Sequence, residues 1–332
     1  MHRHRADPPF LPGTTRPRRR RDVLAAEFEE LAALVDDAGV TDVLVVGGRG
    51  TWVDRGTGLG RAGPVLPEAR VRELATELVA RGGRHVDETT PCVDVRHGDG
   101  IRVHVVLAPV SVTGTAISIR LPAADRPTLA SLEALGAFRR IPRSVVERAV
   151  DERRNVLVTG ATGSGKTTLL AAMLSAVPPD ERIVTVEDVA ELRIDHPHVV
   201  ALEARQANAE GAGALGLDRL VREALRMRPD RIVVGECRGA EVRELLSALN
   251  TGHDGGAGTV HANGIADVAA RLEALGTLAG LGPEALARQA VSALDLVLHV
   301  ERHGGQRRLA AVGAVRIGPD GRLEVRPVDR SR

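Results

Sequence analysis

One segment limits what this chain can fold into more than any other: residues 155–170, which read NVLVTGATGSGKTTLL. The apolar run Val156–Val158 is typical of a buried strand, and a glycine-rich turn and a helix-forming sequence follow it. From Gly160 to Thr167 the turn fits the G-x-x-x-x-G-K-S/T spacing of a phosphate-binding loop. Because such a loop joins a central strand to a helix, the segment predicts a strand–loop–helix unit in an α/β sheet.

Each residue type in this loop has a physical reason to be there. Its glycines let the backbone adopt φ > 0 and bring N–H groups close to a phosphate. Lys166 is expected to reach the β- and γ-phosphates of ATP, and the hydroxyl of Thr167 to hold Mg²⁺. The predicted nucleotide-binding residues are the whole loop and the first residues of its helix: Gly160, Ala161, Thr162, Gly163, Ser164, Gly165, Lys166, Thr167 and Thr168.

The identity of Lys166 strengthens this interpretation. It is the only lysine among 332 residues, whereas the remaining 44 of the 45 lysine and arginine residues are arginines. A compact ammonium and a planar guanidinium are not interchangeable at a phosphate loop, and chance alone would place the lysine here about once in 300. A glycine-rich turn with an incidental surface lysine is the weaker explanation.

Charge and composition exclude several other classes of protein. Residues 1–22 hold seven arginines and two aspartates, a net charge of +5, so the other 310 residues carry −4 of the formal total of +1. With three Phe, one Trp and no Tyr, the chain also has few rings on which bases could stack. A slightly acidic, aromatic-poor body is a poor nucleic-acid binder, so we expect none as a partner.

The cysteines and the hydropathy pattern exclude further classes. Cys92 and Cys237 are far apart and form no C-x-x-C pair, so neither a disulfide framework nor a zinc site is indicated. No apolar run approaches the ~18 residues of a membrane span, and no secretory signal follows the basic N-terminus. These features fit a protein of the reducing cytosol.

The pattern of apolar residues divides the chain into four parts. Residues 1–21 are expected to be a disordered basic tail, either a solvated leader or a segment attracted to anionic lipid. Residues 22–121 predict a small α+β domain with a mainly antiparallel sheet, and 122–128 a linker. In 129–332, strands and helices alternate, which predicts an α/β domain with a largely parallel sheet.

The predicted elements can be stated by residue range. The first domain has expected helices at 22–38 and 67–81 and expected strands at 42–46, 51–54, 92–97, 101–107 and 115–121. The second domain has expected strands at 155–159, 182–187, 198–203, 231–235, 257–261, 294–300, 308–316 and 322–327. Its expected helices are 129–137, 142–153, 165–176, 217–227, 239–250, 265–279 and a short one from Pro283.

Three predicted strands of the second domain end in polar residues. Glu187 and Asp188 follow one strand, Glu236 the next and His261 the third. Ligands of such sheets bind at the carboxyl ends of the strands, which is where the phosphate-binding loop lies. We expect a carboxylate to accept a proton from the attacking water, another to hold Mg²⁺, and His261 to lie near the γ-phosphate. The predicted metal ligands are Thr167, Glu187, Asp188 and Glu236.

Each of these residues also has a plainer explanation. Glu187 and Asp188 could cap a turn, and His261 could be a structural histidine with its hydrogen bonds satisfied. A carboxylate at the end of the apolar run before Glu236 is costly unless it is used. In the first domain, Arg102 and Arg120 are candidates for stabilising the transferred phosphate, but solvated arginines on a half-exposed sheet are common.

Taken together, the motifs resemble those of the secretion ATPase superfamily of type II and type IV systems, most closely the Tad-type (CpaF-like) pilus ATPases. The resemblance runs from about Val40 to His299. It rests on segments that are similar, in this order, to the first-domain strands, Walker A, Asp box, Walker B and His box of the family: 40–45, 100–104, 118–120, 160–168, 186–192, 225–239 and 252–263.

The resemblance implies a fold and a function. It implies a hexameric ring of two-domain subunits, each a RecA-like P-loop NTPase domain preceded by a small α+β domain, with Arg102 and Arg120 reaching toward ATP. It also implies ATP hydrolysis at the cytoplasmic face of the inner membrane, driving pilin assembly or protein export through an integral platform protein. Gly235 stands where many P-loop proteins carry a magnesium-binding aspartate, as is usual in this superfamily.

Two details of the sequence bear on which branch of the superfamily it resembles. Leu121 replaces the lysine that the family carries after the arginine, and the four-cysteine zinc module of many type II ATPases is absent from the sequence. Two alternatives stay open: a nucleic-acid (conjugative) translocation ATPase on the same core, and a non-hydrolysing regulatory subunit. The second would predict a damaged site, yet Lys166, Thr167, Glu187 and Glu236 are all present.

Overall fold

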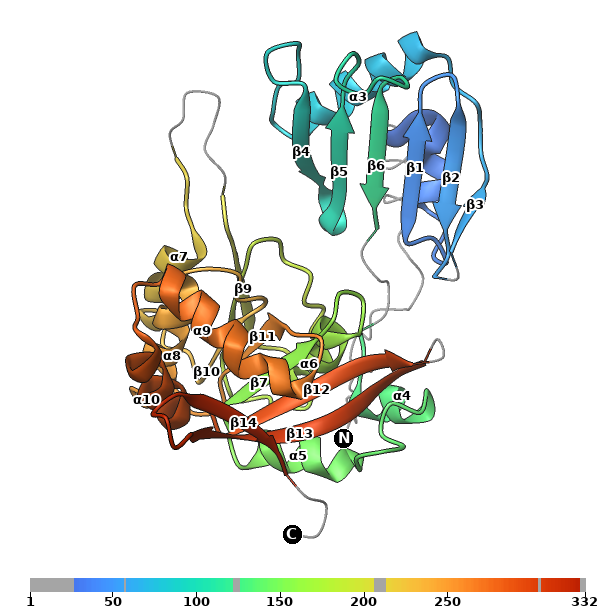
Figure 1. The fold of residues 1–332 in the computed structure, drawn as a ribbon. Helices are drawn as coiled ribbons and strands as arrows, with labels where there is room; N and C mark the ends of the chain where they lie inside the picture. Colours follow the sequence, from blue (N-terminus) through green and yellow to red (C-terminus); the bar gives the residue numbers. More distant parts are fainter. Residues whose placement is uncertain (1–26, 57, 122–125, 206–212, 304–305, 329–332) are drawn as a thin grey trace, which may run out of the picture. The chain divides into compact units, whose positions relative to one another are not determined.

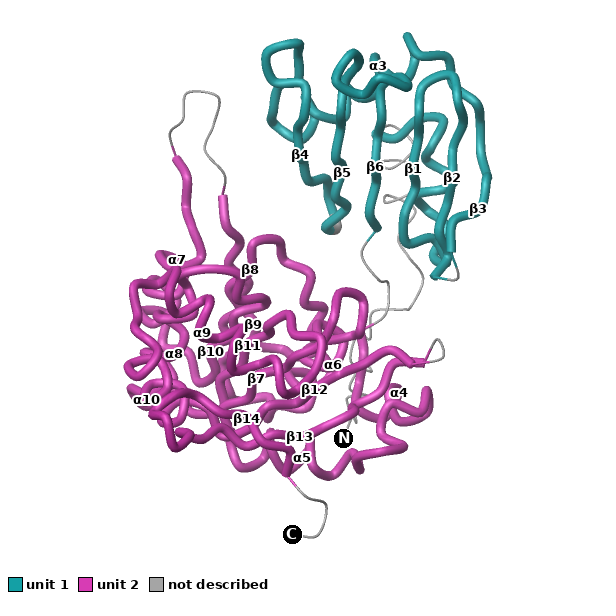
Figure 2. Tube along the Cα trace, viewed as in Figure 1, with its two compact units in different colours: residues 1–123 teal, residues 124–332 magenta. Residues whose placement is uncertain are grey.

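The chain forms two compact units, residues 1–123 and 124–332, shown in Figures 1 and 2. The computed structural model describes residues 27–56, 58–121, 126–205, 213–303 and 306–328. The predicted basic tail, the first residues of the predicted helix 22–38 and most of the predicted linker lie outside these residues. Each unit is described by itself below.

The first unit is a single antiparallel sheet with one long helix on one face. Its strand order is β3-β2-β1-β6-β5-β4, and every pairing is antiparallel. The strands are β1 (Asp42–Val46), β2 (Gly50–Asp54), β3 (Leu59–Arg61), β4 (Cys92–His97), β5 (Ile101–Val106) and β6 (Ala116–Arg120). The long helix is α3 (Glu68–Arg81), and the short helices are η1 (Glu29–Leu31), α2 (Ala32–Val35) and η2 (Gly98–Gly100).

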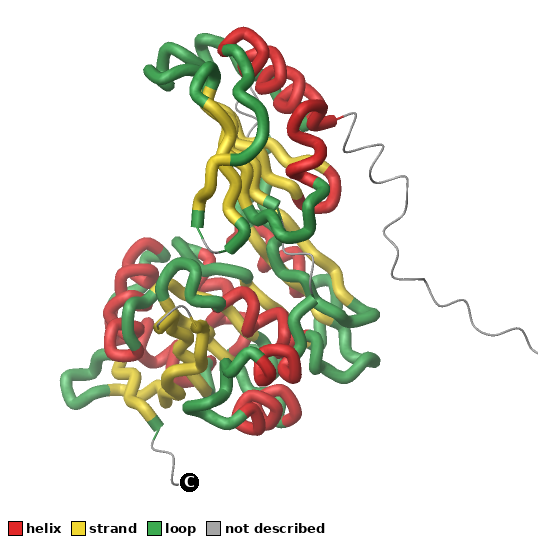
Figure 3. The backbone as a smooth tube through the Cα atoms, turned by 90° about the vertical axis from the view of Figure 1, so that its right-hand side faces the viewer, coloured by secondary structure: helices red, strands yellow, loops and turns green. Residues whose placement is uncertain are grey.

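The alternation of buried and exposed side chains along the strands explains why only one face of this sheet is covered. In β1, β5 and β6 every second side chain is buried, as a sheet with one covered face requires. The buried side chains pack against Val71, Leu74 and Leu78 of α3 in one apolar core. Figure 3 shows the helices of this unit on one side of its strands. The open face therefore carries the polar residues of the strands.

Two local features of the first unit differ from the expectation. The predicted helix 22–38 is interrupted at Glu29, whose φ of 46° lies in the left-handed region, and its last described turn ends at Val35. The short strand β3 was not expected, because its three residues are all exposed and give no alternating pattern.

The second unit is built on an eight-stranded, mostly parallel sheet. Its strand order is β14-β13-β12-β7-β11-β10-β8-β9, parallel from β12 to β9 and antiparallel from β12 to β14. The parallel strands are β7 (Val156–Gly160), β8 (Ile183–Glu187), β9 (Val199–Glu203), β10 (Arg231–Val234), β11 (Ala257–His261) and β12 (Leu296–His303). The antiparallel strands are β13 (Gln306–Ile317) and β14 (Leu323–Pro327).

Helices cover both faces of this sheet, as a parallel sheet requires. Side chains of α4 (Leu129–Ala134), α5 (Arg143–Asp151) and α6 (Lys166–Leu174) form one apolar cluster with the sheet. Side chains of α7 (Leu217–Leu225), α8 (Glu241–Leu249), α9 (Val268–Leu278) and α10 (Pro283–Ala293) form another. The short η3 (Ile265–Asp267) precedes α9. All residues of β7, β8 and β10 are buried, which is why these strands read as continuous apolar runs.

Within the described residues, no helix is both long enough and apolar enough to cross a lipid bilayer. All strands expected from the sequence are present, with ends that differ by no more than three residues.

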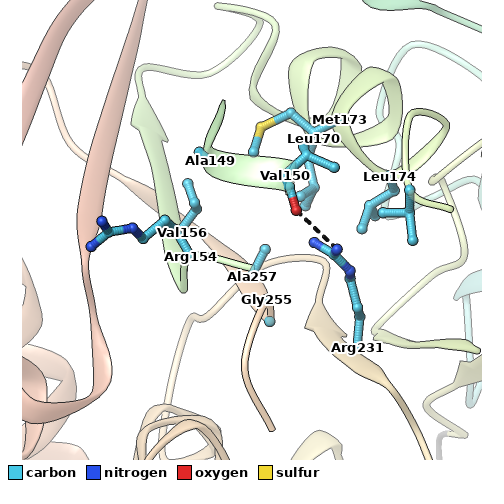
Figure 4. Close-up of a pocket in the computed structure, with 12 residues that line it drawn as sticks. Ala149, Val150, Arg154, Val156, Leu170, Met173, Leu174, Arg231, Gly255 and Ala257 are labelled. Carbon is cyan, nitrogen blue, oxygen red and sulfur yellow. Dashed lines mark hydrogen bonds between the residues drawn. The ribbon is translucent and has the colours of Figure 1, made fainter. Parts of the chain in front are cut away.

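A small pocket lies at the amino-terminal edge of the parallel strands, at the opposite end from the phosphate-binding loop. Its internal volume of about 10 Å³ is that of one water site. Beside it, Arg231 is almost fully buried, and its guanidinium donates to the Glu181 carboxylate (Nε–Oε2, 2.7 Å) and to the carbonyl oxygen of Val150 (2.9 Å; Figure 4). Arg153 binds the same carboxylate at 2.9 Å. This ion pair ties the starts of two strands to α5.

We predict that Arg231→Leu lowers the free energy of unfolding by about 3 kcal/mol or more, because it leaves the part-buried Glu181 with one partner fewer. The matched control is Arg226→Leu, at a side chain that is 78% exposed and bound to Glu223. That change should cost no more than about 1 kcal/mol. Denaturant unfolding of both variants measures the difference. Equal losses of unfolding free energy would show that the buried ion pair stabilises the fold no more than the exposed one.

Candidate nucleotide-binding site

The phosphate-binding loop joins β7 to α6, as the sequence predicts. Gly163 and Gly165 have φ values of 71° and 102°, which side chains rarely tolerate, and Gly165 is the residue before the first turn of α6. The first N–H groups of α6 have no partner within the helix, so they are available to an anion together with the positive end of the helix dipole. The loop therefore has the backbone shape of an anion-binding site.

Two glycines of the loop are also needed because another element is close to them. A Cβ on Gly160 would lie 2.2 Å from the carbonyl oxygen of Val300, and one on Gly165 would lie 3.1 Å from Cδ of Arg307. Val300 and Arg307 belong to the β12–β13 hairpin, which is more than 130 residues away in the sequence. Sequence reasoning missed these two contacts because no local sequence pattern indicates them.

One buried hydroxyl of the loop fits the presence of a phosphate. Ser164 is 1% exposed, and its Oγ has no hydrogen-bond partner within the residues that the structure describes. A buried polar atom without a partner costs free energy, so an anion or water at this loop would relieve that cost. The loop thus fits a nucleotide phosphate in its shape and in its hydrogen-bonding capacity.

Lys166 lies against its own loop. Its Nζ donates to the carbonyl oxygens of Gly160 and Ala161, both at 3.1 Å, and lies 3.2 Å from Nδ1 of His261. The residue is only 7% exposed, and this burial lowers the pKa of the ammonium below its usual value, while Glu236 acts in the opposite direction. A bound phosphate would offer this ammonium a charged acceptor in place of two neutral carbonyls.

His261 connects the lysine to a carboxylate. Its Nε2 lies 2.5 Å from Oε1 of Glu236, although this carboxylate oxygen has no hydrogen-bond partner within the described residues. Nδ1 of a neutral ring can accept a hydrogen bond from Lys166. Burial, and then the charge of Lys166, lower the pKa of the His261 imidazole, which favours this neutral form. The other oxygen of Glu236 accepts hydrogen bonds from Arg238 at 2.8 Å (Nε) and 2.6 Å (Nη2). Lys166, His261, Glu236 and Arg238 therefore form a continuous polar chain.

Glu187 is the last residue of β8, which lies on the side of β10 away from β11 and His261. It is 4% exposed, and its Oε1 accepts hydrogen bonds from the backbone N–H groups of Glu191 (2.9 Å) and Leu192 (3.1 Å). A Cβ on Gly235 would lie only 2.5 Å from Cγ of Glu187. Glycine at this position therefore makes room for Glu187, which explains why no aspartate stands there.

The four predicted metal ligands are not arranged as a ready-made cage. Within the described residues, no group of three or more histidine, cysteine, aspartate or glutamate side chains is placed to hold a metal ion. Asp188 is exposed, and its charge adds to the hydrogen bond and charge of Glu236 in raising the pKa of Arg238. Mg²⁺ usually takes one or two carboxylates together with substrate phosphates and water, so Thr167 and a carboxylate still fit the ion once a nucleotide is bound.

The two predicted arginines of the first unit lie side by side. Arg102 of β5 is directly opposite Arg120 of β6, and Nε of Arg120 donates to Asp42 at 3.1 Å. The structure thus places Arg102 and Arg120 next to each other. Lys166, His261 and Glu236 are brought together separately, in the second unit, and Glu187 lies against Gly235, the residue before Glu236.

Sequence reasoning missed two further residues of the site. Arg238 gave no signal because it follows Glu236 in a loop, where arginines are common. His299 follows the apolar run that begins β12, and it is almost fully buried beside the loop, with Nδ1 3.0 Å from the Thr159 hydroxyl. Burial lowers the pKa of the His299 imidazole, and Lys166 acts in the same direction, while Glu301 and Asp267 oppose this. A histidine in an otherwise apolar strand was the available signal.

The chain matches the family model described as type II/IV secretion system protein over residues 64–311. A putative conjugal transfer protein of Mycobacterium tuberculosis is 51% identical over 294 residues, covering 86% of this chain and 84% of the relative. The chain belongs to the type II/IV secretion system protein family. The conjugal transfer protein TrbB of Rhizobium radiobacter is 31% identical, with 86% of both chains covered.

Solved structures of the family share the fold. The pilus retraction motor PilT with bound ADP superimposes with a TM-score of 0.62 at 23% identity, covering 91% of this chain and 83% of PilT. The ATPase DotB of Legionella pneumophila gives 0.59 at 22% identity, covering 88% and 80%. The predicted fold, a RecA-like P-loop domain with a largely parallel sheet after a small α+β domain, is therefore confirmed. The family match over residues 64–311 confirms the predicted type II/IV secretion superfamily.

We predict that acid weakens the second unit partly through His299. Its folded-state pKa is lowered below the ~6.5 of an unfolded histidine, so the unfolded state binds more protons as pH falls from 7.5 to 5.5. His299→Gln should therefore lose less stability across this range than the wild type. The difference between the two losses should be less than about 1.4 kcal/mol per pH unit. Denaturant unfolding at both pH values measures this. His303→Gln, at an exposed position of the same strand, is the control and should keep the wild-type slope.

Proposed function

We propose that this chain is an ATPase that uses Mg²⁺ and couples ATP hydrolysis to mechanical work in a secretion or pilus-assembly system. The observation that carries the proposal is the polar chain from Lys166 through His261 to Glu236 at the mouth of the phosphate-binding loop. It joins the group that would hold the γ-phosphate to the carboxylate that would handle the attacking water. Membership of the secretion family supports the same reaction.

The roles of the individual residues follow from their positions. The backbone N–H groups of the loop and Lys166 would hold the phosphates of ATP, with Thr167 on Mg²⁺, which supplies positive charge at the phosphates. Glu236 would orient the water and accept its proton, because it lies at the strand end next to the lysine. Glu187, fixed by two backbone N–H groups, would hold the metal through water, and Asp188 is a further candidate ligand.

The remaining parts of the proposal concern the assembly. We expect a homohexamer in which Arg102 and Arg120 add positive charge at the γ-phosphate. The ring would work at the inner face of the cytoplasmic membrane on integral platform proteins, and so move pilin-like subunits or exported proteins. The Tad-type (CpaF-like) pilus ATPases are the branch that we propose, on the motifs quoted above and on the absence of a four-cysteine module from the sequence.

A second candidate function is nucleic-acid translocation in conjugation. It is favoured by the printed names of relatives, since both the mycobacterial protein and TrbB are called conjugal transfer proteins. The slightly acidic body of this chain, −4 outside residues 1–22, opposes direct contact with DNA. The two candidates differ in one measurement: single- or double-stranded DNA should leave the ATPase rate unchanged for a pilus or export motor, and should stimulate it for a translocase.

We predict that Glu236→Gln keeps ATP binding and lowers kcat by about 100-fold or more, because the general base is lost while the phosphate loop is unchanged. Steady-state ATPase assays and equilibrium binding of ATP measure the two effects. The matched control is Glu223→Gln, at a half-exposed carboxylate that pairs only with Arg226 in the described residues. Normal turnover in Glu236→Gln would assign the base role to Glu187 instead.

A further inference from the structure

The β12–β13 hairpin lies beside the phosphate-binding loop. Strand β12 pairs in parallel with β7 up to His299, which is opposite Thr159, and then continues beyond the end of β7 to His303. The carbonyl oxygen of Val300 is close to Gly160, where it would be 2.2 Å from a Cβ. Figure 1 shows the two long strands running past β7 and the start of α6. The loop is therefore flanked by the hairpin on one side.

Arg307 of β13 is the hairpin residue that covers the loop. Its Cδ would be 3.1 Å, and its Cβ and Cγ 3.8 Å, from a Cβ on Gly165. The next residue, Arg308, is bound to Glu301 at 2.7 Å. The guanidinium of Arg307, in contrast, has no hydrogen bond or ion pair with the residues that the structure describes, and the residue is exposed. A cation without a counter-charge thus lies over the loop that is expected to take up phosphates.

The position of the hairpin in the sheet indicates which end of a nucleotide it would meet. The sheet order is β12-β7-β11-β10, so the hairpin and the catalytic strands lie on opposite flanks of β7. Lys166 contacts His261 on the β11 side, and Glu236 follows β10. A nucleotide with its γ-phosphate at these residues would extend its nucleoside toward the other flank, which is the side of Arg307.

Among the described residues of the second unit, no exposed phenylalanine, tyrosine or tryptophan side chain is available to stack on a base. Among the described residues the aromatic rings of phenylalanine and tryptophan are Phe28, Trp52 and Phe138. The first two belong to the other unit, and Phe138 is buried in the core of the second. A planar guanidinium stacks on a flat ring as an aromatic side chain does, and it also carries charge.

We propose that Arg307 binds the nucleoside end of the nucleotide, with its guanidinium stacked on the base. This inference rests on the proposed function, because it assumes that the loop holds a nucleotide. It makes Arg307 a binding residue that acts on nucleoside mono-, di- and triphosphates alike, and that contributes nothing to the recognition of a bare polyphosphate.

The test compares two ligands by equilibrium titration of the full chain: ADP, and inorganic tripolyphosphate, which lacks a nucleoside. Arg307→Ala should weaken ADP binding about tenfold, which corresponds to about 1.4 kcal/mol, and leave tripolyphosphate binding within twofold of the wild type. Arg307→Lys should restore only a small part of the loss, because an ammonium cannot stack in the plane of a base. Since the side chain is exposed, both variants should keep the thermal stability of the wild type.

The matched control is Arg302→Ala. Arg302 is exposed and lies directly opposite Arg307 in the hairpin, so the change removes the same charge from the same element. It should leave ADP binding within twofold. Unchanged ADP binding in Arg307→Ala, an equal loss in Arg302→Ala, or an equal loss of tripolyphosphate binding would each overturn the inference while the wild type still binds ADP. A wild type that binds neither ligand would instead overturn the proposed function.

Discussion

The buried ammonium of Lys166 is the charge on which the arrangement of the second unit depends. A cation that is 7% exposed is costly unless acceptors surround it, and here two loop carbonyls and His261 do so. The carbonyl groups are held in place because Gly160 and Gly165 pack against the β12–β13 hairpin. The histidine is held by Glu236, and Glu236 by Arg238. The loop, hairpin and strand ends therefore form one connected structure around a single charge.

A second constraint acts at the neighbouring strand end. Glu187 is almost fully buried, and the absence of a side chain at Gly235 is what leaves space for it. We propose that Glu187 from β8 and Glu236 from the loop after β10 take the place of the carboxylate that many P-loop proteins carry after this strand. The two carboxylates lie at the ends of neighbouring strands, and their partners differ: backbone N–H groups for Glu187, charged side chains for Glu236. Different surroundings are what allow two similar groups to perform different tasks.

The loop itself could be predicted because its signal is local: glycines, lysine and threonine at fixed spacing between a strand and a helix. The contact of Glu236 with His261, and the position of Glu187 at the neighbouring strand end, could be predicted because parallel strands end at the same edge of a sheet. The contacts of Gly160 with Val300 and of Gly165 with Arg307 could not, because they join segments far apart in the sequence with no shared pattern. The strand β3 was missed since its residues are all exposed. The mutual position of Arg102 and Arg120 became visible only with the strand register.

The most direct test of the account is labelling by an amine-reactive ATP analogue with its reactive group at the phosphate end. Lys166 is the only lysine, its amine is buried, and its lowered pKa leaves more of the reactive neutral form. The account predicts one labelled side chain, Lys166, protection of it by excess ATP, and loss of turnover in Lys166→Arg with the fold unchanged. Labelling confined to the terminal amine, or labelling of Lys166 that ATP does not reduce, would contradict the account.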